Sequence, residues 1–287
     1  MEIFLAEVFA SGFFMFFGCM SLMTGFTNKL ITPLEAGFAF AFIISSIIVM
    51  FIHVSGAHLN PAITVTMIIL GVVKPEMAIV YVIADCLGAC LGYKLLTVVT
   101  PHDIIFHGVD KSIGFCTTIP NPLLTTTQAL FMEFFCTFFL IFMVCGAVDP
   151  RSNSQPDTLP IKFSFAIIGI VLTAGHYGIS MNPVRSLAPA LFNGIWTKHW
   201  RIGRKDKKER WNLEELNEVK ERQEFEKEGI DRMLRKKKEE GNNSSCKKKI
   251  YWVGPIGAGF TAPVFYKLMF QRNPEKSKVE PNFNQNK

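Results

Sequence analysis

Charged residues are scarce over most of this sequence. Of its 287 residues, the segment from Arg201 to Lys249 holds 17 of the 30 Lys and Arg and 12 of the 24 Asp and Glu. The other 238 residues therefore carry only 13 basic and 12 acidic side chains. A soluble domain does not need so apolar a body. A helical bundle in lipid does, because the bilayer core solvates neither charges nor free backbone groups.

The start of the sequence also lacks the pattern of a signal peptide. Met1 is followed by Glu2, and the apolar run that follows passes Met20 without a small-residue cleavage site. We therefore expect the first apolar segment to be retained as a transmembrane helix. No nucleophile–base pattern, metal-ligand spacing or phosphate-binding loop is present, so neither an enzyme nor a metal or cofactor site is predicted.

The seven cysteines form no CxxC pair, which argues against a zinc site and against a disulfide framework. Five of them lie in apolar runs and are expected to be small buried apolar side chains. These five are Cys19, Cys86, Cys90, Cys136 and Cys145. Cys116 and Cys246 lie in polar loops, and they are the two that could pair outside the cell.

The apolar segments predict an all-α membrane protein. A run of about 20 apolar residues crosses a bilayer as a helix, and six segments qualify: 3–24, 35–54, 77–98, 128–148, 161–177 and 250–270. Two further runs, 62–71 and 184–195, are too short to span, and each begins at an Asn-Pro step. We therefore predict six transmembrane helices and two half-helices.

The two halves of the chain resemble each other. Glu7 and Glu133 open the first and fourth spans in similar Phe-rich settings, 126 residues apart, and the two Asn-Pro steps lie 122 residues apart. Three spans separate equivalent elements, so the second copy enters the membrane from the opposite side. Such an inverted repeat with broken helices points to a site near the bilayer midplane.

The Asn-Pro steps at Asn60-Pro61 and Asn182-Pro183 predict helix starts. Asn is a favoured N-cap, and Pro suits the next position because its missing N–H costs nothing there. Because its side-chain oxygen accepts a hydrogen bond from a backbone N–H of the first turn, each Asn keeps its side-chain NH₂ free to donate into a cavity. Two opposed half-helices also aim their positive ends at one point, which favours neutral solutes over cations.

These motifs resemble those of the aquaporin, or major intrinsic protein, family. The resemblance is seen in the segments 55–62, with Asn60-Pro61-Ala62, and 180–186, with Asn182-Pro183-Val184. The resemblance covers 1–200 and 250–271. It implies a homotetramer in the plasma membrane with lipid around it. The run from Met181 to Asn193-Gly194 and His199-Trp200 is most similar to the insect entomoglyceroporin branch, which conducts glycerol and urea with water.

The resemblance also implies which residues form the filter. Arg185, three residues after Asn182, matches the filter arginine, and a charge in a transmembrane half-helix is a functional candidate on its own account. Phe40 and Ile179 match two further walls. The fourth wall is a His in water-selective members. Here it is Ile170 by ungapped counting, or Val171 if one residue is deleted, so we expect a wider and more apolar filter.

Three buried polar residues are expected to support the pore loops. The resemblance assigns Glu7 and Glu133 the bracing of the loops that carry the half-helices, which fits a buried carboxylate that needs donors. A proton relay is the alternative for the pair. His58, two residues before Asn60, is expected to support its loop in the same way.

The domain organisation follows from these segments. We expect a channel domain over 1–271, a charged insertion at 201–249 that is either extracellular or an error of the gene model, and a cytoplasmic tail at 272–287. The mixed charge of the 201–249 insertion argues against a nucleic-acid partner. Basic residues in the short loops favour cytoplasmic termini.

The predicted function is a passive channel for water, glycerol and urea. A strictly water-selective channel and a junctional or structural membrane protein with weak transport are the alternatives. A coupled transporter also uses broken helices, but it needs carboxylates for substrate ions near the midplane.

Overall fold

The computed structural model describes residues 1–27, 31–107, 114–152, 158–195 and 250–270, and the described part is made of helices and loops without a strand. The predicted insertion at 201–249 and the tail at 272–287 lie outside the described residues. The six long helices are α1 (Glu2–Met20), α2 (Pro33–Ser55), α4 (Met77–Val99), α6 (Thr126–Val148), α7 (Leu159–Ala174) and α11 (Ile250–Phe270). The two predicted half-helices are α3 (Pro61–Leu70) and α8 (Pro183–Asn193). Short turns complete the described elements: α5 (His102–Ile105), η1 (Pro150–Ser152) and η3 (Gly175–Tyr177). The prediction of an all-α membrane fold is confirmed.

Local sequence sets the helix starts. At α2 the hydroxyl of Thr32 accepts from the Glu35 N–H at 3.2 Å, while the Glu35 carboxylate accepts from the Thr32 N–H at 2.8 Å. Thr125 and Gln128 repeat this reciprocal cap at the start of α6. Each arrangement satisfies two of the amides that a helix start leaves unpaired. The same device therefore begins one long helix in each half.

Among the described helices, five are long and apolar enough to cross a membrane: α1, α2, α4, α6 and α7 extended to Tyr177. The predicted sixth span, α11, has 21 residues and includes Pro255, Pro263 and Lys267. Its length suits a bilayer crossing. Neighbouring helices can satisfy the backbone groups that a proline frees inside such a span.

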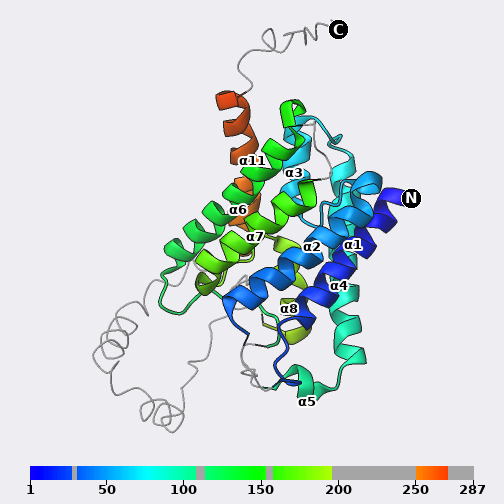
Figure 1. The fold of residues 1–287 in the computed structure, drawn as a ribbon, viewed down its shortest axis with the longest axis vertical. Helices are drawn as coiled ribbons and strands as arrows, with labels where there is room; N and C mark the ends of the chain where they lie inside the picture. The colour runs from blue at the N-terminus through cyan, green and yellow to red at the C-terminus, as the bar shows by residue number, and fades with distance from the viewer. Residues whose placement is uncertain (28–30, 108–113, 153–157, 196–249, 271–287) are drawn as a thin grey trace, which may run out of the picture.

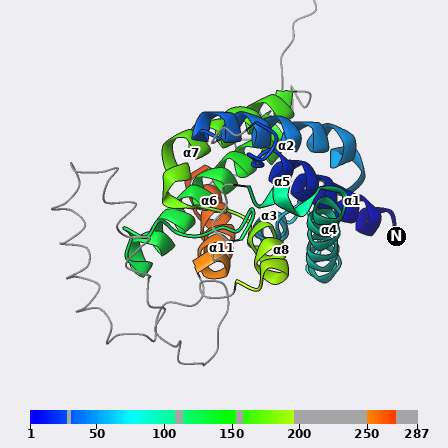
Figure 2. The same cartoon turned by 90° about the horizontal axis from the view of Figure 1, so that it is seen from below.

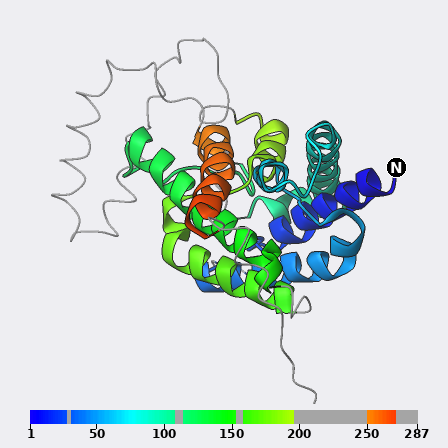
Figure 3. The ribbon, with the colours of Figure 1, turned by 90° about the horizontal axis from the view of Figure 1, so that it is seen from above.

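The helices pack as two related halves (Figures 1 and 2). In the first half α1 contacts α2 and α4, and in the second half α6 contacts α7 and α11. The halves meet where α2 lies along α7, and each half-helix packs on the third long helix of the opposite half, α3 on α11 and α8 on α4. Figure 3, from above, shows the short helices among the long ones. The inverted repeat thus places both half-helices inside the bundle.

The closest helix packing is between α1 and α4. A Cβ atom added at Gly88 would fall on the backbone carbonyl of Val8, and one added at Gly92 would fall on that of Gly12. Small residues four apart allow such backbone approach between membrane helices. The GxxxG pair of α4 is therefore a packing feature.

Candidate functional site

The two Asn-Pro steps meet in the middle of the bundle. Asn60 caps α3 by accepting from the Ala62 N–H at 3.0 Å, and Asn182 caps α8 by accepting from the Val184 N–H at 3.0 Å. Pro61 and Pro183 occupy the first helical positions. Each cap of this kind stabilises a helix by about 1 kcal/mol. The two helix starts, 122 residues apart in sequence, face one another at the centre.

The amide groups of these asparagines are not wholly free, which corrects the sequence prediction. Asn60 Nδ2 donates to the carbonyl of Met181 at 2.8 Å, and Asn182 Nδ2 donates to the carbonyl of Leu59 at 2.8 Å. An amide NH₂ has two hydrogens, so each Asn retains one donor for a solute. The crossed pair ties the two half-helices together. The sequence of one half could not reveal a bond to the other.

The buried glutamates lie behind these loops. Glu7 accepts from the N–H groups of His58 and Leu59, both at 2.9 Å. Glu133 accepts from the N–H of Ser180 at 2.8 Å and of Met181 at 2.6 Å. Both carboxylates are buried, with exposed fractions of 0% and 1%. Each binds two consecutive amides, so each loop is held just before its Asn.

Side chains inside the loops complete the inverted pattern. His58 Nδ1 lies 3.0 Å from the hydroxyl of Thr64, and the hydroxyls of Ser186 and Ser180 lie 2.5 Å apart. His58 lies two residues before Asn60, and Ser180 lies two residues before Asn182. The two pairs are equivalent in the repeat, because His58 and Ser180 are 122 residues apart, and so are Thr64 and Ser186. The loops therefore use different chemistry in equivalent places.

Two tyrosines for which no role was predicted from the sequence hold the loops from behind. The hydroxyl of Tyr81 on α4 donates to the carbonyl of Ser55 at 2.6 Å. The hydroxyl of Tyr251 on α11 donates to the carbonyl of Gly178 at 2.7 Å. The sequence feature that could have identified them is their position. Each lies near the start of the third long helix of its half, and these two helices are equivalent in the repeat.

A cavity of ≈ 520 Å³ runs beside the helix starts. Its wall is mostly apolar, with side chains such as Ile48, Leu140 and Phe163. The polar groups on it are few, and they include Asn60, Asn182 and Arg185. An apolar wall with a few fixed donors suits the passage of small polar molecules, because it orients them without holding them.

The four predicted filter residues all line this cavity: Phe40, Val171, Ile179 and Arg185. The guanidinium of Arg185 lies 5.7 Å from the centre of the Phe40 ring. Ile170, the other candidate for the fifth-span position, is instead buried in a cluster with Ala41 and Leu140. Of the two candidates, Val171 is the one that lines the cavity, and its place in the filter stays a prediction.

Arg185 is held by a loop that the sequence analysis did not connect with the filter. Its Nη1 donates to the carbonyl of Cys116 at 2.9 Å and to the hydroxyl of Thr118 at 2.8 Å. Thr118 also lies 2.8 Å from the Ser186 hydroxyl, next to Arg185 on α8. The segment 114–118 therefore supplies partners that fix the arginine.

The cysteine predictions are wrong in two respects. Cys19 is not simply an apolar side chain, because it forms a disulfide with Cys116. Cys116 therefore pairs with Cys19 and not with Cys246, which lies outside the described residues. The two cysteines are 97 residues apart, and the chain between them folds back over the end of α1. The spacing of the cysteines in the sequence does not predict this pairing.

Asp85 has an unusual environment on α4. It is fully buried, and its Oδ1 accepts from the Ser11 hydroxyl at 2.9 Å. Its Oδ2 has no hydrogen-bond partner among the described residues. The sequence analysis gave Asp85 no role, and the structure places it against α1, close to Glu7.

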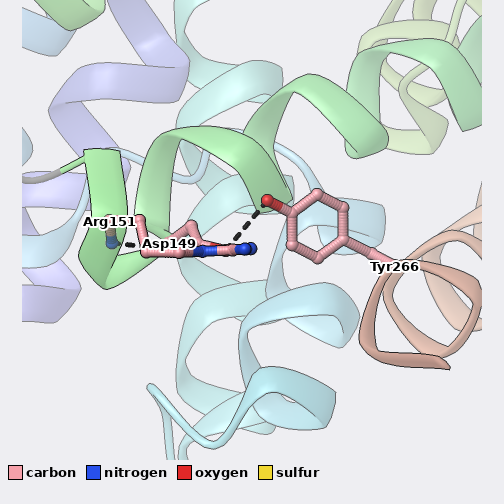
Figure 4. Close-up of polar contacts among 3 residues, drawn as sticks. All are labelled: Asp149, Arg151 and Tyr266. Atoms are coloured by element: carbon pink, nitrogen blue, oxygen red, sulfur yellow. Dashed lines mark hydrogen bonds and ion pairs between the residues drawn. The ribbon is translucent and has the colours of Figure 1, made fainter. Parts of the chain in front are cut away.

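At the end of α6, Asp149 joins two elements (Figure 4). It accepts from Arg151 Nε at 2.8 Å and Nη2 at 2.5 Å, and from the Tyr266 hydroxyl of α11 at 3.0 Å. The hydrogen bonds from the Arg151 side chain are the main reason that the pKa of Asp149 lies well below its usual range. A carboxylate stabilised in this way favours the folded state while it is ionised.

We expect the stabilising effect of Asp149 to disappear in acid. Its folded pKa is lowered, so its contribution is complete above the unfolded pKa of about 4 and is lost as the pH falls through the folded value. Thermal unfolding of the wild type and of Asp149→Asn in detergent should show a constant difference in Tm from pH 8 to 5, narrowing below about pH 4. A difference that stays constant down to the lowest accessible pH would contradict this linkage.

Comparison with known proteins gives a consistent result. Residues 1–202 match the family model described as Major intrinsic protein. Aquaporin-2 of Homo sapiens is 34% identical over 196 residues, which are 68% of this chain and 69% of that protein. Aquaporin-4 of Mus musculus is 33% identical over 162 residues, 56% of this chain, and the match spans about half, 48%, of its length.

A solved structure shows the same fold. It is the X-ray structure of the aquaglyceroporin from Plasmodium falciparum, with a TM-score of 0.64 and 19% identity, and the match covers 94% of this chain and 95% of that one. At this identity the likeness concerns the fold alone. The helices and half-helices of this chain therefore have the arrangement seen in that structure.

Proposed function

This chain belongs to the major intrinsic protein family, and from this premise we propose that it is a passive membrane channel for water, glycerol and urea. The observation that carries the proposal is the lining of the cavity, which includes the apolar Val171 together with Arg185 and Phe40. An apolar side chain at this position leaves one fixed cation to bind hydroxyl or carbonyl oxygens and one apolar side to receive a carbon backbone. The likeness of the motifs to the entomoglyceroporin branch agrees with this solute class.

The mechanism follows from the donors along the cavity. A solute first meets the Arg185 guanidinium, whose orientation is fixed by the carbonyl of Cys116 and the hydroxyl of Thr118. At the centre it receives the remaining N–H donors of Asn60 and Asn182. Both half-helices begin here, so their positive ends oppose a cation. Neutral molecules that accept hydrogen bonds pass, and the neighbouring apolar wall releases them.

Water-selective transport is the second candidate. Ser186, Ala190, Tyr251 and Trp252 resemble residues of water channels, and the relatives compared above include aquaporin-2 and aquaporin-4. In that case the filter would have to exclude glycerol by width, since no imidazole stands at Val171. The two candidates therefore differ in a single measurable quantity, the flux of small neutral solutes.

We also propose the orientation of the chain. The Cys19–Cys116 disulfide suits an oxidising compartment, which puts the segment 114–118 outside the cell. The ends of α6 and α11 meet on the opposite side at Asp149 and Tyr266. Lys74, Arg151 and Lys267 then lie near the cytoplasmic surface of the plasma membrane, as the positive-inside rule favours. The same family membership supports a homotetramer.

The full chain in proteoliposomes tests the proposal. Under an isotonic glycerol or urea gradient, we expect the vesicles to swell faster than empty vesicles, with a low activation energy and without an ion gradient. Flux of water alone would favour the water-selective candidate. No flux of any kind would favour a structural role, and dependence on an ion gradient would favour a coupled transporter.

A further inference from the structure

The Cys19–Cys116 disulfide joins two elements that touch the filter. Cys19 lies in the last turn of α1, and the preceding residue, Gly18, packs against the ring of Phe40: a Cβ at Gly18 would lie 2.8 Å from Phe40 Cε1. Cys116 lies in the segment 114–118, and its backbone has a left-handed φ of 59°. One covalent bond therefore connects the turn behind the aromatic wall with the loop behind the arginine.

Cys116 touches Arg185 directly. Its carbonyl accepts from Arg185 Nη1 at 2.9 Å, and its Sγ lies 3.7 Å from Nη2. A carbonyl can orient a guanidinium only as well as its own position is fixed. The left-handed backbone at Cys116, which most residues avoid, requires a constraint from outside the segment to persist.

The remaining anchors of the segment lie at other residues. Asn193 Nδ2 donates to the carbonyl of Phe115 and to the hydroxyl of Thr117, and the Tyr93 hydroxyl also donates to Phe115. These bonds hold the segment to α4 and α8 whether or not the disulfide is present. The disulfide is the covalent restraint at Cys116 itself, so its loss should change the filter without unfolding the loop.

We propose that the Cys19–Cys116 disulfide is a specificity-determining tether that fixes Arg185 in the filter, with Cys116 as a positioning residue. The inference rests on the proposed function, because it concerns which neutral solutes pass. Without the tether, the Cys116 carbonyl loses its fixed place and the guanidinium samples several orientations. A solute with several hydroxyl groups needs a fixed donor more than water does. Glycerol flux therefore falls more than water flux.

The test compares Cys19→Ser with the wild type and with Cys90→Ser, which alters a free, half-buried cysteine of α4. Cys19→Ser removes the tether and leaves the Cys116 carbonyl in the chain. In proteoliposomes we expect it to lower the ratio of glycerol to water permeability roughly 3- to 10-fold, the factor expected from one hydrogen bond. Cys116→Ser should have the same effect, the double variant should add nothing further, and Cys90→Ser should match the wild type.

Chemical reduction gives a matched experiment on the wild type. Dithiothreitol supplies two electrons and two protons, the S–S bond breaks to give two thiols, and the reagent becomes its cyclic disulfide. We expect the reduced wild type to show the ratio of Cys19→Ser, and Cys19→Ser itself not to respond. Thiol titration of the untreated, denatured wild type should find Cys19 and Cys116 unreactive. Reactive Cys19 and Cys116 there would overturn the proposal.

Amide hydrogen exchange separates the tether from the proposed function. We expect faster exchange at 114–118 and around Arg185 in Cys19→Ser than in the wild type. If the wild type passes no glycerol but this exchange increases, the solute proposal fails and the tether stands. If glycerol passes and neither the permeability ratio nor the exchange changes in folded Cys19→Ser, the tether is overturned.

Discussion

Val171→His should lower glycerol and urea permeability by about 10- to 100-fold and leave water permeability close to that of the wild type. The factor is of the order that one misfitting methylene costs in a tight apolar pocket, and histidine adds three heavy atoms to the side chain of valine. Val171 lines the cavity, and its Cβ faces Gly37 of α2, where an added Cβ would lie 3.5 Å away in van der Waals contact. We expect an imidazole at this place to extend into the cavity. It narrows the filter and adds a second polar group, a combination that water tolerates and a carbon backbone does not.

The matched control for this variant is Val171→Leu. Leucine also enlarges the side chain but adds no hydrogen-bonding group, so it separates width from polarity. We expect Val171→Leu to reduce glycerol flux by a smaller factor than His. The measurement is stopped-flow light scattering of proteoliposomes under glycerol, urea and sucrose gradients, with the amount of folded protein normalised. Glycerol flux through Val171→His equal to that of the wild type would contradict a filter wall at this residue.

Glu133→Ala should destabilise the protein by about 2–6 kcal/mol, because each buried amide left without a partner costs about 1–3 kcal/mol. The amides are those of Ser180 and Met181, which donate to the two carboxylate oxygens. Alanine leaves a void in a buried site, where water finds few other partners. The loop before Asn182 would lose its register, and the pore would lose its second half-helix start.

The first half of the chain provides the matched comparison. Glu7→Ala removes the acceptors of His58 and Leu59 and should have an effect of similar size. Gln at either position keeps one oxygen acceptor and should show an intermediate loss. Glu35→Ala is the control, because Glu35 is exposed and takes part in the cap of α2, worth about 1 kcal/mol. Thermal unfolding in detergent and the yield of monodisperse protein measure the effect. A decrease in Tm for Glu133→Ala no larger than the decrease for Glu35→Ala would refute the role of Glu133 in bracing the loop.

Much of the fold could be predicted from the sequence. The six long helices begin and end within a few residues of the apolar segments, because the length of an apolar run and the bilayer thickness determine a span. The half-helices start at Pro61 and Pro183, where the Asn N-cap and the following Pro act locally. These features depend on residues that are neighbours in the chain.

The candidate site could be predicted only in part. Sequence alone left Ile170 and Val171 as alternatives, because a deletion of one residue around 176–178 would shift the count from Asn182. It left the amide groups of Asn60 and Asn182 free, although each donates to the opposite loop. It also gave no partner for Arg185. Each of these answers depends on residues that are distant in sequence.

By itself, then, the amino-acid sequence determined the spans, the caps and the inverted repeat, since hydrophobicity and helix-start chemistry are properties of short segments. Only the tertiary structure decided which side chain faces the cavity, how the two half-helices bind each other and that Cys19 pairs with Cys116. The reason is physical: these contacts exist only after segments about 100 residues apart in the chain have packed together, and no local pattern encodes the geometry of that packing.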